Sequence, residues 1–92
     1  MINANAKVGN NCIVNTNALV EHDAVVANHC HISTYSVLNG AVSVGKFCTI
    51  GSNATLVQNI CIANDVIIGA GAVVNKNIEH AGTYVGVPAK KI

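Results

Sequence analysis

The chain has 92 residues, of which 51% are hydrophobic, 10% are charged and only three are aromatic. So many aliphatic and so few charged side chains exclude an intrinsically disordered segment, and a formal charge of +1 gives no field that would hold a nucleic-acid backbone. No apolar run reaches the ~18 residues that span a bilayer, because Gly69 and Gly71 interrupt the longest candidate. The sequence opens without the pattern of a signal peptide, so we expect a cytoplasmic location and reduced cysteines.

A six-residue repeat runs from residue 2 to residue 77. Every sixth residue is aliphatic, thirteen times in succession: Ile2, Val8, Val14, Val20, Val26, Ile32, Leu38, Val44, Ile50, Leu56, Ile62, Ile68 and Val74. The residue two places before each aliphatic is mostly small, and the three places after it hold all thirteen Asn and all six Gly of the repeat region. Asn and Gly tolerate the left-handed backbone of tight turns. Each hexad is therefore predicted to be a three-residue strand followed by a three-residue turn.

These strands predict an all-β fold. Alternate residues of a strand share a face, so the small and the aliphatic residue point inward and the residue between them points outward. Three hexads can form a triangular coil of 18 residues, and successive coils stack about 4.8 Å apart as parallel strands. We therefore predict a parallel β-helix of hexapeptide repeats with about four coils over residues 1–77, and a short C-terminal tail over residues 78–92.

The cysteines and histidines raise the question of a metal site. Cys12, Cys30 and Cys48 are 18 residues apart and so form one inward column. Tetrahedral zinc needs ligands that converge on a point, which a straight column does not provide, so we interpret these thiols as small core residues. Zinc between subunits would require histidines from two faces to converge, whereas His29 and His31 point in different directions. We expect no metal.

The turn Glu21-His22-Asp23 is the only one with three titratable groups. The equivalent turn one coil further holds Asn39-Gly40-Ala41, so nothing large is expected to cover the imidazole. A histidine beside a carboxylate is the arrangement in which one ring nitrogen is held and the other is kept basic. This pattern makes His22 a candidate general base; the alternative is a solvated charged turn.

Several segments together carry a family resemblance: Asn15-Thr16, Glu21-His22-Asp23, His31-Ile32-Ser33, Val44-Gly45, Ile68-Gly69-Ala70-Gly71-Ala72-Val73-Val74 and Val85-Gly86-Val87-Pro88-Ala89-Lys90. In these segments the chain resembles the hexapeptide-repeat sugar O-acyltransferases of the sialic acid O-acetyltransferase type, whose close relatives N-acetylate UDP-linked amino sugars. The resemblance covers nearly all of the chain. It implies a left-handed coil, acetyl-CoA as the acetyl donor and a homotrimer with active sites between subunits.

The same resemblance implies roles for five residues. In such proteins a histidine at the place of His22 is the general base, and the acid at the place of Asp23 raises its basicity. The contacts to acetyl-CoA fall on His31, Ser52 and Ala70. Members usually carry an N-terminal nucleotide-sugar domain, and this sequence begins inside the β-helix, so we expect that domain to be absent.

The leading hypothesis is an acetyltransferase that transfers acetyl from acetyl-CoA to a hydroxyl or amine of a sugar or nucleotide-sugar. His22 would take the proton of the acceptor, and a proton on the His31 ring would stabilise the acetyl oxygen. The column that contains Ser52 and Ala70 would hold the pantetheine arm, and Lys90 and Lys91 would bind the CoA phosphates because the chain has no Arg. Two alternatives stay open: a catalytically incomplete structural or regulatory trimer, and a zinc protein like the gamma-class carbonic anhydrases.

The outward strand positions form three columns, one for each face of the prism. They are Ile13, His31, Thr49 and Ile67 on face 1; Leu19, Val37, Thr55 and Val73 on face 2; and Lys7, Val25, Ser43 and Cys61 on face 3. We expect faces 1 and 2, with their large aliphatics, to pack against neighbouring subunits in a ring of three. By register, His22 lies at the corner of faces 2 and 3 and His31 on face 1, so a shared reaction needs adjacent subunits.

Overall fold

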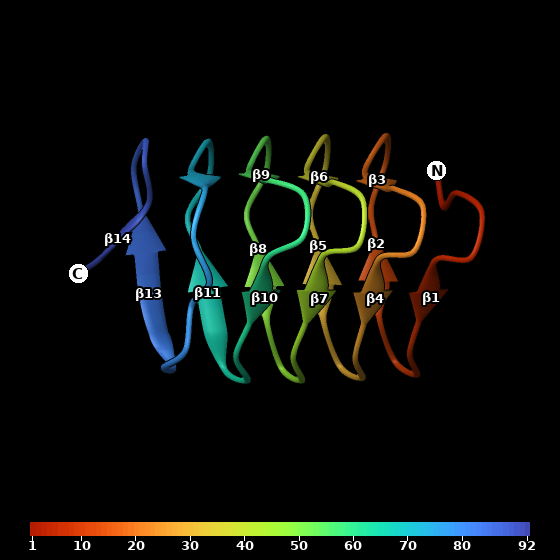
Figure 1. Ribbon diagram of the computed structural model, residues 1–92, viewed down its shortest axis with the longest axis horizontal. Helices are drawn as coiled ribbons and strands as arrows, with labels where there is room; N and C mark the ends of the chain where they lie inside the picture. The colour runs from red at the N-terminus through yellow and green to blue at the C-terminus, as the bar shows by residue number, and fades with distance from the viewer.

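The computed structural model describes all 92 residues and consists of short strands without any helix (Figure 1). The strands in chain order are β1 Lys7–Val8, β2 Ile13–Val14, β3 Leu19–Val20, β4 Val25–Val26, β5 His31–Ile32, β6 Val37–Leu38, β7 Ser43–Val44, β8 Thr49–Ile50, β9 Thr55–Leu56, β10 Cys61–Ile62, β11 Val66–Ile68, β12 Val73–Val74, β13 Gly82–Val85 and β14 Lys90–Lys91. Up to β10 they recur every six residues, as the repeat predicts. None of the elements is a helix long and apolar enough to cross a bilayer.

Three parallel sheets form the sides of a triangular prism about 32 Å long (Figure 1). Face 1 contains β2, β5, β8, β11 and β13, face 2 contains β3, β6, β9 and β12, and face 3 contains β1, β4, β7 and β10. Between neighbouring strands of the repeat, paired residues are 18 apart, for example Val14 with Ile32 and Ile32 with Ile50. The predicted parallel β-helix of about four coils is therefore confirmed.

One residue in each turn has a left-handed backbone. Positive φ values between 55° and 65° recur every six residues from Asn5 to Asp65, and seven of these eleven residues are Asn or Asp. The other four are His29, Tyr35, Ala41 and Phe47. A left-handed backbone costs such residues about 1–2 kcal/mol each, so the stacking of the coils must offset that cost at these four positions.

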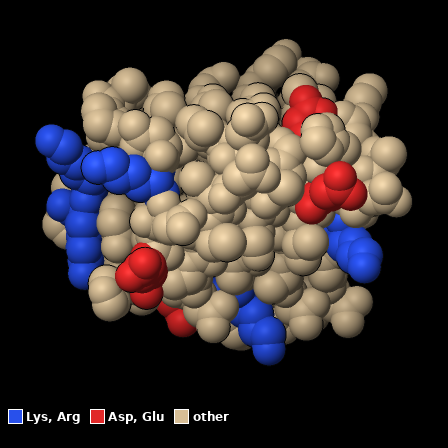
Figure 2. Space-filling model, in the orientation of Figure 1, with Lys and Arg blue, Asp and Glu red and all other residues tan.

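Strand stacking continues beyond residue 77, where the sequence repeat ends. Ile78 bridges to Ile62 on face 3, and β13 pairs in parallel with β11 on face 1. The strand β14 then folds back and pairs antiparallel with β13. Residues 78–92 thus close the C-terminal end of the prism, which is also where lysine side chains gather in Figure 2.

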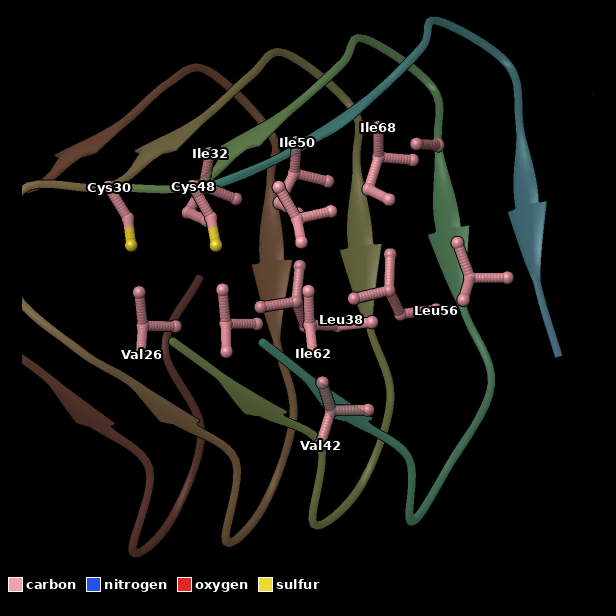
Figure 3. Close-up of a cluster of buried hydrophobic side chains, with 14 of the residues drawn as sticks. Val26, Cys30, Ile32, Leu38, Val42, Cys48, Ile50, Leu56, Ile62 and Ile68 are labelled. Carbon is pink, nitrogen blue, oxygen red and sulfur yellow. The ribbon is translucent and has the colours of Figure 1, made fainter. Parts of the chain in front are cut away.

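The core is built from the repeated aliphatic positions. Figure 3 shows their side chains pointing into the prism from all three faces: Ile32, Ile50 and Ile68 from face 1, Leu38 and Leu56 from face 2, and Val26 and Ile62 from face 3. Each of these seven residues is at most 4% exposed. At ~1.5–3 kcal/mol for each fully buried aliphatic side chain, these columns are the main source of stability.

The thiols of Cys30 and Cys48 also point into the core (Figure 3). Their Sγ atoms donate hydrogen bonds to the carbonyl oxygens of Gly45 and Ala63, at 3.0 and 3.1 Å. Burial raises the pKa of the Cys30 thiol from 9.0 to about 11 and raises the pKa of the Cys48 thiol as well. These cysteines therefore occupy the small inward position of their hexads, as their spacing predicts.

We predict that the free energy of unfolding falls as the pH rises from 9 towards 11. In that interval the unfolded chain releases the proton of the Cys30 thiol and the folded chain keeps it, so a higher pH favours unfolding. Urea unfolding at fixed protein concentration over this pH range measures the effect. Cys30→Ala should weaken the pH dependence, and Cys61→Ala, which removes an exposed thiol, should not. An unchanged pH dependence in Cys30→Ala would contradict the assignment.

Candidate active site

The turn between β3 and β4 places His22 and Asp23 together on the corner of faces 2 and 3. Nδ1 of His22 lies 3.3 Å from Oδ2 of Asp23. Because a carboxylate oxygen can only accept, Nδ1–H is the donor and Nε2 is left free to accept a proton. The side chains of His22 and Asp23 are 70% and 58% exposed, so a molecule in solution can reach the ring. The pair predicted from sequence is therefore in contact.

Backbone hydrogen bonds to both neighbouring coils hold this turn. The amide of Asp23 donates to the carbonyl oxygen of Ala4 at 3.1 Å, and the amide of Ala41 donates to the carbonyl oxygen of His22 at 3.0 Å. The carboxylate of Glu21 accepts a hydrogen bond from the side-chain amide of Asn3 on the preceding coil. Glu21 is thus engaged away from the imidazole, and Asp23 is its acidic partner.

The imidazole of His22 lies over Gly40, the residue at the same turn position one coil further. A Cβ built on Gly40 would come within 2.7 Å of Cε1 and 2.8 Å of Nε2 of the ring. The sequence predicts that nothing large covers the imidazole on this side. It does not predict that the ring contacts the glycine directly.

His31 lies in β5 on face 1, on the opposite side of the prism from the corner that carries His22. Nδ2 of Asn15, in the preceding coil, is 2.9 Å from Nε2 of the His31 ring. An amide nitrogen can only donate, so Nε2 accepts and the neutral ring carries its proton on Nδ1. The ring of His31 thus has a fixed tautomer and one free donor.

Ser52 and Ala70 lie in successive turns between faces 1 and 2, and both are exposed. Their coils are joined by the hydrogen bond from the amide of Gly71 to the carbonyl oxygen of Ser52, at 2.8 Å. The structure therefore brings Ser52 and Ala70 together at the edge of the face that carries His31. It does not bring these three residues to His22 and Asp23 within one chain.

A pocket of about 310 Å³ lies at the C-terminal end of the prism, between the last turn and the tail. It is lined by Val74, Asn75, Lys76, Asn77, Ile78, Tyr84, Pro88, Ala89, Lys90 and Lys91. Three of the five lysines of the chain line it, and no acidic residue does. Figure 2 shows lysines gathered at this end of the molecule. This combination suits an anion with an apolar part.

Lys76 is the lysine of this pocket that the sequence analysis missed. It follows His22 by three whole coils and so stands in the same corner column, a position that counting in steps of 18 would have found. Lys90 and Lys91 reach it only because the tail folds back at β14. No three His, Cys, Asp or Glu side chains come together in the structure as a metal site would require.

Comparison with protein-family models and with the curated proteins finds no match by sequence. Among solved structures, a perosamine N-acetyltransferase from Caulobacter crescentus, in complex with CoA and GDP-perosamine, matches with a TM-score of 0.96 and 38% identity. The match covers 99% of this chain and 44% of that one. The acetyltransferase domain of PglB from Neisseria gonorrhoeae, in complex with acetyl coenzyme A, matches with a TM-score of 0.87 and 34% identity, over 99% of this chain and 47% of that one.

A third similar structure is the serine acetyltransferase of Neisseria gonorrhoeae, with a TM-score of 0.93 and 31% identity over 99% of this chain and 39% of that one. The chain thus spans less than half the length of each of the three proteins. All three are acetyltransferases, which confirms the resemblance drawn from the repeat and its motifs. The chain therefore shares the sequence repeat and the left-handed parallel β-helix of the hexapeptide-repeat acetyltransferases to which it is similar.

Proposed function

We propose that this chain is the donor-binding and catalytic β-helix of an acetyltransferase, which transfers acetyl from acetyl-CoA to a hydroxyl or amine of a sugar or nucleotide-sugar. The observation that carries the proposal is the exposed pair of His22 and Asp23, with Nδ1 and Oδ2 3.3 Å apart. Support also comes from similar structures that contain CoA, acetyl-CoA and GDP-perosamine.

In the proposed reaction, Nε2 of His22 takes the proton of the acceptor as the acceptor oxygen or nitrogen attacks the thioester carbonyl carbon. Asp23 holds Nδ1–H and stabilises the imidazolium that forms. When the bond from carbon to sulfur breaks, the imidazolium returns the proton to the departing thiolate. The products are the acetylated acceptor and free CoA, and the histidine ends the reaction neutral, as it began.

We propose that a homotrimer completes this site. Face 1 leaves Ile13 and Ile67 54% and 48% exposed, and such apolar surface suits contact with another subunit. In this arrangement His22 of one subunit and His31 of the next face the same acetyl group. The free Nδ1–H of His31 then donates to the acetyl oxygen as charge develops on it, and Ser52 and Ala70 line the path of the pantetheine arm.

The lysine-lined pocket is the proposed site for the phosphates of CoA. Lys76 and His22 stand in one corner column, three coils or about 14 Å apart. A pantetheine arm laid along the prism can connect a thioester near the imidazole with phosphates near the lysines. Tyr84, Pro88 and Ala89 provide the apolar part of the same pocket.

We predict that the chain binds CoA without an acceptor and that Lys76→Gln and Lys90→Gln each weaken binding by roughly 2–5-fold, the value of one exposed ion pair. The affinity for acetylpantetheine, which lacks the nucleotide phosphates, should not change in either variant. Lys7→Gln, at the other end of the prism, is the matched control and should leave CoA affinity unchanged. Titration calorimetry measures all three, and no heat of binding at millimolar CoA would refute donor binding.

We predict that His22→Ala lowers the rate of acetyl transfer by ~10²–10⁴, the usual contribution of a general base, and leaves CoA affinity nearly unchanged. The measurement is CoA release from acetyl-CoA with a panel of nucleotide-linked amino sugars. A variant that keeps most of its turnover would mean that another residue is the base. CoA binding without transfer to any acceptor would favour the structural or regulatory alternative.

We predict that His22→Ala and His31→Ala chains, refolded together, recover activity that neither has alone. A boundary that joins the His31 side of a His22→Ala chain to the His22 side of a His31→Ala chain has both intact histidines. Native mass spectrometry identifies the mixed oligomers whose turnover is measured. Mixed trimers no more active than the parents would show that the two histidines do not share a site.

A further inference from the structure

We propose that Gly40 is a positioning residue for the base, because the imidazole of His22 occupies the space that a side chain at residue 40 would need. The inference rests on the function proposed above and names a second residue on which that site depends. It predicts that the smallest possible side chain at residue 40 moves the ring without unfolding the protein.

The contact between Gly40 and His22 is close and involves one edge of the imidazole ring. A Cβ on Gly40 would lie 2.7 Å from Cε1, 2.8 Å from Nε2 and 3.4 Å from Nδ1 of His22. Real Cβ atoms essentially never approach another heavy atom closer than 3.0 Å. The part of the ring nearest Gly40 is therefore the edge that carries Nε2, the nitrogen that takes the proton in the proposed reaction.

The burial of Gly40 is further evidence for its contact with the imidazole. The residues in the column of His22 are Ala4, His22, Gly40, Gln58 and Lys76, and only Gly40 is buried. The backbone itself does not demand a glycine there, since the glycines with positive φ are Gly71, Gly82 and Gly86. The imidazole is what covers residue 40, so the need for a glycine comes from the ring.

The backbone around Gly40 is held more firmly than the ring. The amide of Ala41 donates to the carbonyl oxygen of His22 at 3.0 Å, and the amide of Asn59 donates to the carbonyl oxygen of Gly40 at 2.9 Å. The side chain of His22, in contrast, is 70% exposed and makes one side-chain hydrogen bond, to Asp23. A Cβ at residue 40 is therefore accommodated by rotation of the imidazole, which moves Nδ1 from Asp23 and Nε2 from the acceptor.

The test is Gly40→Ala, assayed in the full chain for kcat, for the CoA dissociation constant and for thermal stability. We expect kcat to fall roughly 10–100-fold, as displacement of a catalytic group does, with CoA affinity and Tm nearly unchanged. Gln58→Ala places the same methyl group at the same corner one coil further from His22 and should keep full activity. In a His22→Ala background, Gly40→Ala should cause no further loss, because the ring through which it acts is gone.

Equal losses from Gly40→Ala with and without His22, or unchanged kcat in the single variant, would overturn the inference. A nuclear Overhauser contact between Hε1 of His22 and the Hα protons of Gly40 tests the geometry without any turnover, and its absence would also overturn it. If the contact is observed and His22→Ala keeps full activity, the proposed function fails, and the catalytic role of Gly40 fails with it.

Discussion

The hydrogen bonds between successive coils are the constraint on which the rest of the structure depends. The amides of Val25 and Ala27, for example, donate to the carbonyl oxygens of Val42 and Val44 at 2.8 and 2.9 Å, and the same offset recurs throughout the repeat. Because this ladder is in register at 18 residues, each side chain lies next to the residue 18 places away. Core columns, corner columns and the neighbours of the candidate base are all consequences of that spacing.

The same register explains how unfavourable turn residues are tolerated. His29 and Phe47 both have positive φ, near 60°, which a bulky residue such as Phe47 rarely adopts. They are 18 residues apart, and their rings stack with centroids 4.9 Å apart and an angle of 10° between planes. An aromatic pair contributes ~0.5–1.5 kcal/mol beyond its buried area, which offsets part of the ~1–2 kcal/mol that each left-handed residue costs. Strain at one turn is thus relieved by its neighbour in the next coil.

The sequence predicts those parts of the structure that follow from the period. The inward columns, the left-handed turns and the placement of His22 and His31 on different sides of the prism all come from counting in sixes. The tail cannot be found this way, because residues 78–92 have no repeat and the pairing of β13 with β14 depends on contacts far apart in sequence. Side-chain conformations cannot be predicted from the period either. The hydrogen bond from the side-chain amide of Asn15, which fixes the tautomer of His31, depends on the rotamers of both residues.

In a solenoid of this kind, the stability of the fold and the chemistry of the site depend on different positions of the repeat. The inward columns stabilise the fold, and the corner positions carry the candidate site. His22 and Gly40 occupy the same turn position in successive coils, so a corner can change its side chains while the inward columns that stabilise the fold stay the same. A long donor with a thioester at one end and phosphates at the other suits such a line of positions. What one prism does not provide is a second wall, since His31, Ser52 and Ala70 lie away from the corner of His22. In the proposed function, the assembly of subunits is therefore part of the chemistry, because the neighbouring copy brings the residues that face the base.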